Sequence, residues 1–431
     1  MKLFNWKCKN NPIYKLSEQP IIVRYISSNE LLWGKSGVLI WVPNGKGLLK
    51  WVHGIENKES ISFLLLNDIP LLKWQSYGCP TCEQFLTAGY GIENVDKLTI
   101  ESIKSVTSLE LDLTTEKLLD NINTILKLLK SDLYLISYIP HYPSDGEGNF
   151  FWRMSNIKKE YKALSYSWIR KDAPTFLIPT QTLDKLDYTR VNFYRSKIRR
   201  GEFVGGIAYY MGGYMSALID GHHRATAALL EGVPLSCLTI IPPEGVRYGR
   251  NKQPEKIIFP GYDLDIQTLS KTITEKVCSN IRYEQLTQIQ MSPLLNMISD
   301  NWYKEVPKEW DESANQFPTI SGIEAIQKAG DLNNERIEDL LQSSDSNQED
   351  NLLNIILALS ALRDPRAKDV AKRIASSLKW TAIWREAYKY LATIKTQEIE
   401  DFFINFLVND DKTRPEITKI VDDYFRCFDN A

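Results

Sequence analysis

The chain has 431 residues, of which 43% are hydrophobic and 25% are charged, and its formal net charge at pH 7 is −2. This composition is typical of a globular protein and excludes a wholly disordered, collagen-like or low-complexity chain. A net charge near zero disfavours a surface coated with nucleic-acid-binding cations, so nucleic acid is not an expected partner.

Membrane and targeting signals are not evident in the sequence. The longest apolar runs, 61–66 and 352–362, fall well short of the ~18 residues that a membrane-spanning helix needs. The first residues include lysines but lack the apolar core of a signal peptide. We therefore expect a cytoplasmic protein without a membrane partner.

Residues 1–148 are predicted to form an α+β domain of unknown role. Two short apolar runs at 37–42 and 47–52 flank Asn44-Gly45-Lys46, and Asn-Gly between such runs predicts a β-hairpin. The turn-rich segment 141–148 is interpreted as the end of the domain. The other elements expected here are strands at 61–66 and 133–139 and an amphipathic helix at 115–130.

Residues 149–262 alternate between strand and helix patterns, which predicts a mixed α/β domain. Residues 263–342 are more polar and are expected to be a connecting, partly helical region. The elements expected in the α/β domain are strands at 175–178, 204–210, 214–219 and 236–241 and helices at 187–200 and 225–231.

Residues 343–431 are predicted to be all helical. Helices of this length, with Asp-Pro-Arg in a turn at 364–366, indicate HEAT-like stacking, with a plain helical bundle as the alternative. A region of this kind is expected to bind a protein partner. The expected helices are 352–362, 367–378, 380–394, 398–407 and 416–425.

The most informative motif is Asp220-Gly-His-His-Arg224, within the segment 216–228. The pattern predicts a strand that ends in a carboxylate, then a glycine, then the start of a helix. Gly221 allows the backbone to approach a ligand closely, and the N–H groups of a helix N-terminus favour an anion. Arg224 is able to grip a phosphate with two hydrogen bonds, and the two histidines are able to donate to its oxygens. The motif therefore predicts a phosphate pocket, where Asp220 holds Mg²⁺ or acts as a base.

Residues 172–245 resemble the ParB/sulfiredoxin superfamily, because the motif and the order of its flanking elements match the phosphate loop of that superfamily. The upstream match comprises a strand, Pro179-Thr180-Gln181, a helix around 191–200 and a hairpin that leads into the motif. The superfamily includes chromosome-partitioning CTPases, sulfiredoxins and free-serine kinases, which share nucleotide binding through this loop. The resemblance implies a bound nucleotide such as ATP, ADP or CTP, accompanied by Mg²⁺.

Three departures separate this chain from those relatives. Sulfiredoxins have a nucleophilic cysteine where this chain has His222, and partitioning proteins have Gly-Glu-Arg-Arg and a helix-turn-helix domain that we do not find. The serine kinases share Asp-Gly-His-His-Arg, but Gln181 stands where their catalytic glutamate is expected. Since an amide cannot act as a general base, either Asp220 takes that role or the site only binds.

Two functions are therefore expected. The first is a nucleotide-dependent phosphotransferase or nucleotidase acting on a small molecule or a protein, with Asp220 and His223 as its catalytic residues. The alternative, which Gln181 favours, is a non-catalytic sensor of a nucleotide or phosphorylated ligand whose helical domain recruits a partner. DNA binding or nuclease activity is disfavoured. The expected phosphate-binding residues are Gly221, His222, His223, Arg224 and Gln181.

Cys79-Pro-Thr-Cys82 is a lone pair of cysteines at CxxC spacing. It is consistent with two buried thiols, with a redox pair, or with half of a zinc site. The partner ligands of such a zinc site would come from Cys8, His53 or His141.

The segment 141–152 mixes a histidine, two acids and aromatic side chains. It is consistent with a turn anchored by hydrophobic residues, or with a lid over the nucleotide whose base stacks on Trp152 or Trp168. Four cations on or after the helix expected at 187–200 fit either a phosphate-rich ligand or a solvated helix face: Arg195, Lys197, Arg199 and Arg200.

Overall fold

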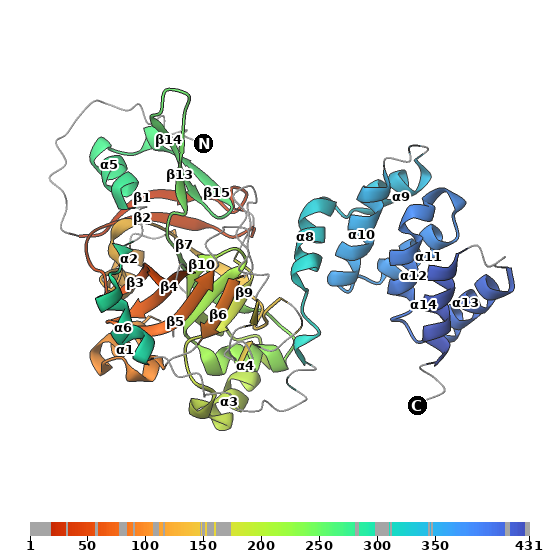
Figure 1. The fold of residues 1–431 in the computed structure, drawn as a ribbon, viewed down its shortest axis with the longest axis horizontal. Helices are drawn as coiled ribbons and strands as arrows, with labels where there is room; N and C mark the ends of the chain where they lie inside the picture. Colours follow the sequence, from red (N-terminus) through yellow and green to blue (C-terminus); the bar gives the residue numbers. More distant parts are fainter. Residues whose placement is uncertain are drawn as a thin grey trace. The chain divides into compact units, whose positions relative to one another are not determined.

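The computed structural model divides the chain into two compact units, residues 1–316 and 317–431 (Figure 1). The boundaries expected at 148/149 and 262/263 both fall inside the first unit, and the boundary expected at 342/343 falls inside the second. The structure describes residues 19–426 with gaps at 32, 57–58, 77–83, 89–90, 107–111, 115–116, 147, 149–150, 153–158, 161–173, 281–283, 298–309, 311–312, 344, 346–347 and 410–413.

A seven-stranded sheet forms the centre of the first unit, in the order β1-β2-β7-β12-β10-β11-β9. β7 pairs with both β2 and β12, so strands from the two domains expected on either side of residue 148 form one sheet. The pairs β10–β12 and β9–β11 are parallel, and the other pairs are antiparallel. The strands are β1 (Ile21–Ile26), β2 (Gly37–Lys46), β7 (Lys130–His141), β9 (Phe176–Pro179), β10 (Gly205–Gly212), β11 (Met215–Asp220) and β12 (Leu235–Ile241).

A second sheet has six strands in the order β16-β3-β4-β5-β6-β8. Its core contains Phe63 and Leu65, against which Met291 and Leu294 of the helix α6 (Gln288–Met297) pack. The strand expected at 61–66 is confirmed within β4. The strands are β3 (Leu49–Glu56), β4 (Glu59–Leu66), β5 (Ile69–Ser76), β6 (Gln84–Ala88), β8 (Lys159–Glu160) and β16 (Glu284–Gln285).

The hairpin predicted around Asn44-Gly45-Lys46 is wrong, although both of its strands exist. β2 belongs to the seven-stranded sheet and β3 to the six-stranded sheet, so the two do not pair. The amides of Lys46 and Gly47 donate to the carbonyl oxygens of Lys127 and Leu129 at 2.9 Å. A Cβ on Gly45 would lie 2.0 Å from the Leu129 oxygen, so the glycine permits close backbone approach here. The chain therefore crosses from one sheet to the other instead of reversing.

Before β7, the described residues form the helices α1 (Lys97–Lys104), with the 3₁₀ turn η1 (Ile92–Asn94) before it, and α2 (Leu118–Leu126). α2 is shorter than the helix expected at 115–130, because the chain enters β7 at Lys130. The strand expected at 133–139 is confirmed within β7. α1 begins with the side chain of Asp96, which accepts a hydrogen bond from the amide of Thr99 at 2.9 Å.

The elements expected around the motif are confirmed, and they meet at one end of the seven-stranded sheet. The helix α3 (Tyr188–Arg199) is capped by the carboxylate of Asp187 and packs against α4 (His222–Leu230) (Figure 1). β10 and β11 form the expected hairpin. α4 begins at His222 rather than at residue 225, so both histidines belong to its first turn.

A small sheet and a helix complete the first unit. The strands β13 (Gly245–Tyr248), β14 (Pro254–Phe259) and β15 (Tyr262–Asp265) are antiparallel neighbours. The helix α5 (Lys271–Asn280) shares a core with this sheet and with β7. The region expected to be partly helical at 263–342 therefore also contains strand structure.

The second unit is helical, as expected. Its core gathers the apolar sides of these helices, with Trp380, Phe403 and Tyr424 among the buried aromatic side chains. Its elements are α8 (Ile320–Ala329), α9 (Asn334–Gln342), α10 (Glu349–Ala361), α11 (Arg366–Ala375), η7 (Leu378–Ile383), α12 (Trp384–Leu391), α13 (Gln397–Asn409) and α14 (Pro415–Arg426). Within the described part of the chain, we find no helix that is both long and apolar enough to span a membrane.

Candidate functional site

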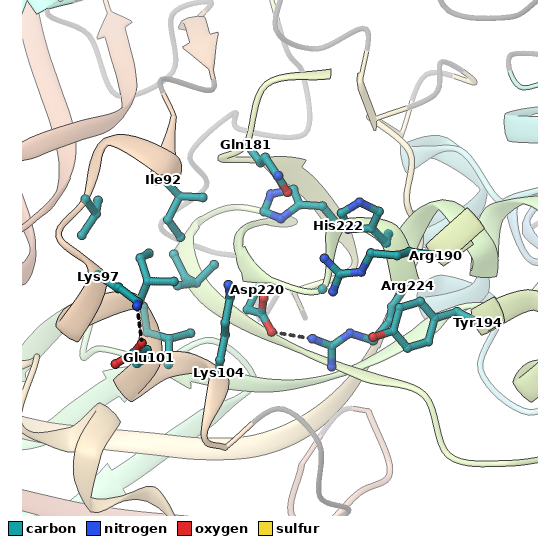
Figure 2. Close-up of a pocket in the computed structure, with 16 residues that line it drawn as sticks. Ile92, Lys97, Glu101, Lys104, Gln181, Arg190, Tyr194, Asp220, His222 and Arg224 are labelled. Carbon is teal, nitrogen blue, oxygen red and sulfur yellow. Dashed lines mark hydrogen bonds and ion pairs between the residues drawn. The ribbon is translucent and has the colours of Figure 1, made fainter. Parts of the chain in front are cut away.

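A cavity of about 370 Å³ opens in the first unit beside the motif (Figure 2). One wall comes from the end of β11 and the first turns of α3 and α4, and the other comes from η1 and α1. The structure brings all of the expected phosphate-binding and catalytic residues to this cavity: Gln181, Asp220, Gly221, His222, His223 and Arg224.

Gly221 makes the direct passage from strand to helix possible. Its φ of 113° lies in the region that favours glycine, and it occupies the N-cap position of α4. A Cβ at this position would lie 3.1 Å from the Cα of Gly206 in β10. The glycine therefore lets the N-terminus of α4 begin beside the end of β11, within the cavity wall.

Arg224 is held by the protein rather than left open to a ligand. Its Nη1 donates to the carbonyl oxygen of Gly205 at 2.7 Å, and its Nη2 donates to the carboxylate of Asp220. The guanidinium also lies over the ring of Tyr194, 5.7 Å from its centroid. These contacts already occupy several of the N–H donors of Arg224. To bind a phosphate with two hydrogen bonds, as the sequence led us to expect, Arg224 would have to exchange some of these contacts for the ligand.

The two histidines also have structural partners. His222 Nε2 accepts the backbone N–H of Thr180, and His223 Nε2 accepts the backbone N–H of Asp187, each at 3.0 Å. Burial lowers the pKa of His222 to about 3. Burial, followed by the charge of Arg190, lowers the pKa of His223. Since Nε2 is an acceptor in both neutral rings, Nδ1 carries the proton, and any hydrogen bond from these histidines to a phosphate would have to come from Nδ1.

These hydrogen bonds position the rest of the cavity. Thr180 accepts the backbone N–H of Ile92 at 3.0 Å, so the residue held by His222 also joins η1 to the motif. His223 holds the amide of Asp187, whose carboxylate caps the helix that carries Arg190. The histidines therefore position Gln181, next to Thr180, and the first turn of α3.

We expect acid to destabilise the fold through His222. The folded chain keeps this ring neutral down to a pKa of about 3, whereas the ordinary histidine pKa is 6.5. The unfolded chain therefore binds an extra proton between these pH values, so the unfolding free energy falls as pH decreases through that window. For one such histidine the loss between pH 7 and pH 5 is about 2 kcal/mol.

Urea unfolding of wild type and His222→Gln at both pH values measures this contribution. Glutamine keeps an acceptor for the Thr180 amide but does not titrate, so the variant should lose less stability between pH 7 and pH 5. An equal loss in both proteins would contradict the assignment of the acid sensitivity to His222.

Arg190 and Lys104 are cavity residues that the sequence analysis missed. Figure 2 shows Arg190 of α3 and Lys104 of α1 pointing into the same space as Asp220. Among the described residues, no hydrogen bond or ion pair is found for the Arg190 guanidinium. One signal was present for Arg190: it stands four positions before Tyr194, which places both on one face of the helix.

The wall formed by η1 and α1 is mainly aliphatic. Ile92, Val95, Ile100 and Ile103 contribute to it, and Lys97 and Glu101 form an ion pair of 3.6 Å on the same helix. This wall lies outside the segment that resembles a known superfamily. Nothing in the local pattern of residues 92–104 indicated that it would face the motif.

The structure offers little support for a dedicated metal centre. No group of three or more His, Cys, Asp or Glu side chains suited to a metal ion is found among the described residues. Both ring nitrogens of His53 contact serine hydroxyls, and those of His141 contact Ile139 O and Ser216 Oγ. The cysteines at 79 and 82, named as zinc or redox candidates, lie outside the described residues.

Trp152 supports the site from within the core and does not cover it. Its side chain is 2% exposed, and its indole N–H donates to Thr226 Oγ1, which in turn donates to the carbonyl oxygen of His222. The other tryptophan considered for a lid, Trp168, lies outside the described residues. Trp152 therefore packs against α4 as a buried anchor, which supports the alternative of a turn anchored by hydrophobic residues and not that of a base stacked on Trp152.

The cations on or just after the C-terminal half of α3 are paired with acids outside the cavity. Arg195 and Arg199 both bind Glu231, and Lys197 and Arg200 both bind Glu202. The pairing supports the interpretation of these four cations as a solvated helix face. None of them lines the cavity.

Comparison of the chain with protein-family models, with curated proteins and with solved structures gives no match. The function is therefore inferred from the cavity itself.

Proposed function

We propose that this chain is a nucleotide-binding protein of the ParB/sulfiredoxin type, with the cavity beside α4 as its binding site. The observation that carries the proposal is the convergence of Gln181 and the Asp220–Arg224 motif on one cavity, together with Arg190. Residues that are far apart in the sequence meet there with the N-terminus of a helix. This combination suits a ligand that carries phosphate groups.

The phosphates would be bound mainly by the α4 N-terminus and by Arg190. Helix N-termini offer N–H groups to anions, and an arginine binds phosphate oxygens in a planar fork. In this proposal, the hydrogen bonds of Arg224 and of the two histidines stabilise the turn from β11 to α4 and the segments next to it. Gln181 contributes an amide, which is able to donate a hydrogen bond but not to remove a proton.

Mg²⁺ would enter this site with the nucleotide. A nucleotide-bound Mg²⁺ often uses one or two carboxylates together with the phosphates, and Asp220 offers one carboxylate beside the cavity. Its ion pair with Arg224 occupies one of the two carboxylate oxygens, Oδ2. The donor set therefore fits a metal that the phosphates help to hold, and that metal would neutralise phosphate charge.

Isothermal titration of the full chain with ATP, ADP, CTP, AMP and CMP, each with Mg²⁺ and with EDTA, tests the proposal. Saturable binding of at least one nucleotide at one site per chain is the expected result. Folded protein that binds none of them, with or without Mg²⁺, would overturn the proposed function.

Phosphoryl transfer or nucleotide hydrolysis is a second candidate, which the position of Asp220 favours. Its carboxylate lies in the cavity wall, where an acceptor hydroxyl or a water would be within reach of a base. We expect Asp220→Asn to reduce turnover about 100-fold while nucleotide binding persists, since general-base catalysis contributes about 10²–10⁴-fold. Equal turnover in wild type and Asp220→Asn would remove Asp220 from the catalytic step.

The helical unit is proposed to bind a protein partner. On α13, Ile404 and Val408 are 48% and 76% exposed and lie one helical turn apart. In a non-catalytic version of the proposal, nucleotide binding would act as a signal that such a partner reads. DNA binding and nuclease activity gain no support from the described residues, because the four cations on or just after the C-terminal half of α3 are paired with acids: Arg195, Lys197, Arg199 and Arg200.

A further inference from the structure

The wall formed by η1 and α1 gives the cavity a second chemical character. The motif side is polar, whereas the opposite side places Ile92 and Ile100, both half-buried, in the cavity wall together with the buried Val95 and Ile103. Aliphatic side chains in a pocket wall favour an apolar or aromatic surface of a ligand. A ligand that filled this cavity would therefore have an apolar body as well as an anionic group.

The charge of the cavity lining indicates how many negative charges its ligand carries. Among the described residues that line it, four are cationic, Lys97, Lys104, Arg190 and Arg224, and two are acidic, Glu101 and Asp220. Glu101 pairs with Lys97 on the wall formed by α1, and Asp220 pairs with Arg224 on the motif side. The lining thus carries a net charge of +2, since burial lowers the pKa of both His222 and His223 and keeps the two rings neutral at pH 7.

A phosphate monoester matches both properties. Its phosphate group carries about −1.5 to −2 charges at pH 7. A nucleoside triphosphate carries about two more negative charges, which this lining would leave uncompensated without a metal ion. The volume of about 370 Å³ lies near the lower limit of ligand pockets, typically ~300–1,000 Å³, so it suits one small ligand.

We propose that the preferred ligand of the cavity is a nucleoside monophosphate. Its phosphate lies between Arg190 and Lys104, which come from opposite walls, and its base packs against the aliphatic side chains of η1 and α1. Lys104 and Ile100 are thereby specificity-determining residues outside the motif. This inference rests on the proposed nucleotide-binding function and adds the phosphorylation state of the ligand to it.

Titration without Mg²⁺ tests the ligand class directly. The probes are AMP, CMP, ATP, adenosine and inorganic phosphate. We expect AMP or CMP to bind at least 10-fold more tightly than ATP, and more tightly than adenosine or phosphate alone. ATP binding as tight as that of both monophosphates would overturn the inference while leaving nucleotide binding itself intact.

Variants of α1 test the two halves of the contact separately. Lys104→Met should weaken monophosphate binding at least 10-fold and leave adenosine binding unchanged, because it removes the charge alone. Ile100→Asn should weaken both the monophosphate and adenosine. Leu98→Asn is the matched control, since Leu98 is 75% exposed on the same helix and does not line the cavity.

The outcomes separate this inference from the proposed function. Wild type that binds no nucleotide at all overturns both. Wild type that binds a monophosphate with an affinity unaffected by Lys104→Met and Ile100→Asn overturns only the role of α1. Lys104 is exposed, so its substitution tests the inference even if Ile100→Asn fails to fold.

Discussion

Arg190→Ala is expected to weaken nucleotide binding about 100-fold, which corresponds to about 2.7 kcal/mol. Arg190 points into the cavity, and the described part of the chain shows no partner that holds its guanidinium away from a ligand (Figure 2). Truncating one member of a buried, hydrogen-bonded charge pair costs about 2–5 kcal/mol of affinity, and we take the lower part of this range because Arg190 is exposed without a ligand. Titration of wild type and variant with the same nucleotide measures the loss.

The matched control is Arg199→Ala on the same helix. Arg199 is exposed, pairs with Glu231 and does not line the cavity, so its removal should change affinity less than about threefold. Arg190→Ala should also unfold at nearly the same temperature as wild type, because no hydrogen bond or ion pair of this guanidinium is found among the described residues. Equal losses of affinity in the two variants would show that α3 acts only through its overall charge.

Arg224→Met is expected to act on stability and to destabilise the first unit by about 3 kcal/mol. The side chain of Arg224 is 12% exposed, and it joins Asp220 at the end of β11 to the Gly205 carbonyl of β10. Removing one partner of a largely buried ion pair leaves the other charge without compensation, at a cost of about 3–5 kcal/mol. We take the lower value because the side chain of Asp220 is 20% exposed. Urea unfolding of the full chain measures the change.

A double variant separates the charge pair from the other contacts of Arg224. Asp220→Asn together with Arg224→Met removes the uncompensated carboxylate, so it should be more stable than Arg224→Met alone. If Arg224→Met were as stable as wild type, the role of this arginine in holding the motif would be wrong. Its guanidinium would then be expected to bind the ligand instead.

The sequence was sufficient to predict the motif side of the site. The passage from β11 to α4, the helix α3 and the β10–β11 hairpin all arise from signals that lie close together in the sequence. A glycine after a strand, an aspartate before a helix and a pair of glycines between strands each specify local geometry. The roles of individual side chains were harder to predict, because the Nε2 partners of His222 and His223 are backbone amides 42 and 36 positions away.

The opposite wall and the sheet pairing depend on contacts between distant segments. The Asn44-Gly45 pair matched a hairpin locally, yet β2 pairs with β1 and with β7, which lies about 90 residues later in the chain. The side chains of α1 face the motif because the Ile92 amide bonds to Thr180, which no local pattern encodes. For the same reason the boundary expected at 148 does not separate two units, since β7 and β12 pair across it.

Hydrogen exchange measured by mass spectrometry, with and without saturating nucleotide, tests most directly whether this cavity is the binding site. The account predicts slower exchange in three separate segments, 92–104, 180–194 and 220–226, because their backbones build the cavity and its two walls. Exchange in α10–α13 should remain unchanged. Nucleotide binding accompanied by protection elsewhere, with these three segments unaffected, would contradict the proposed site.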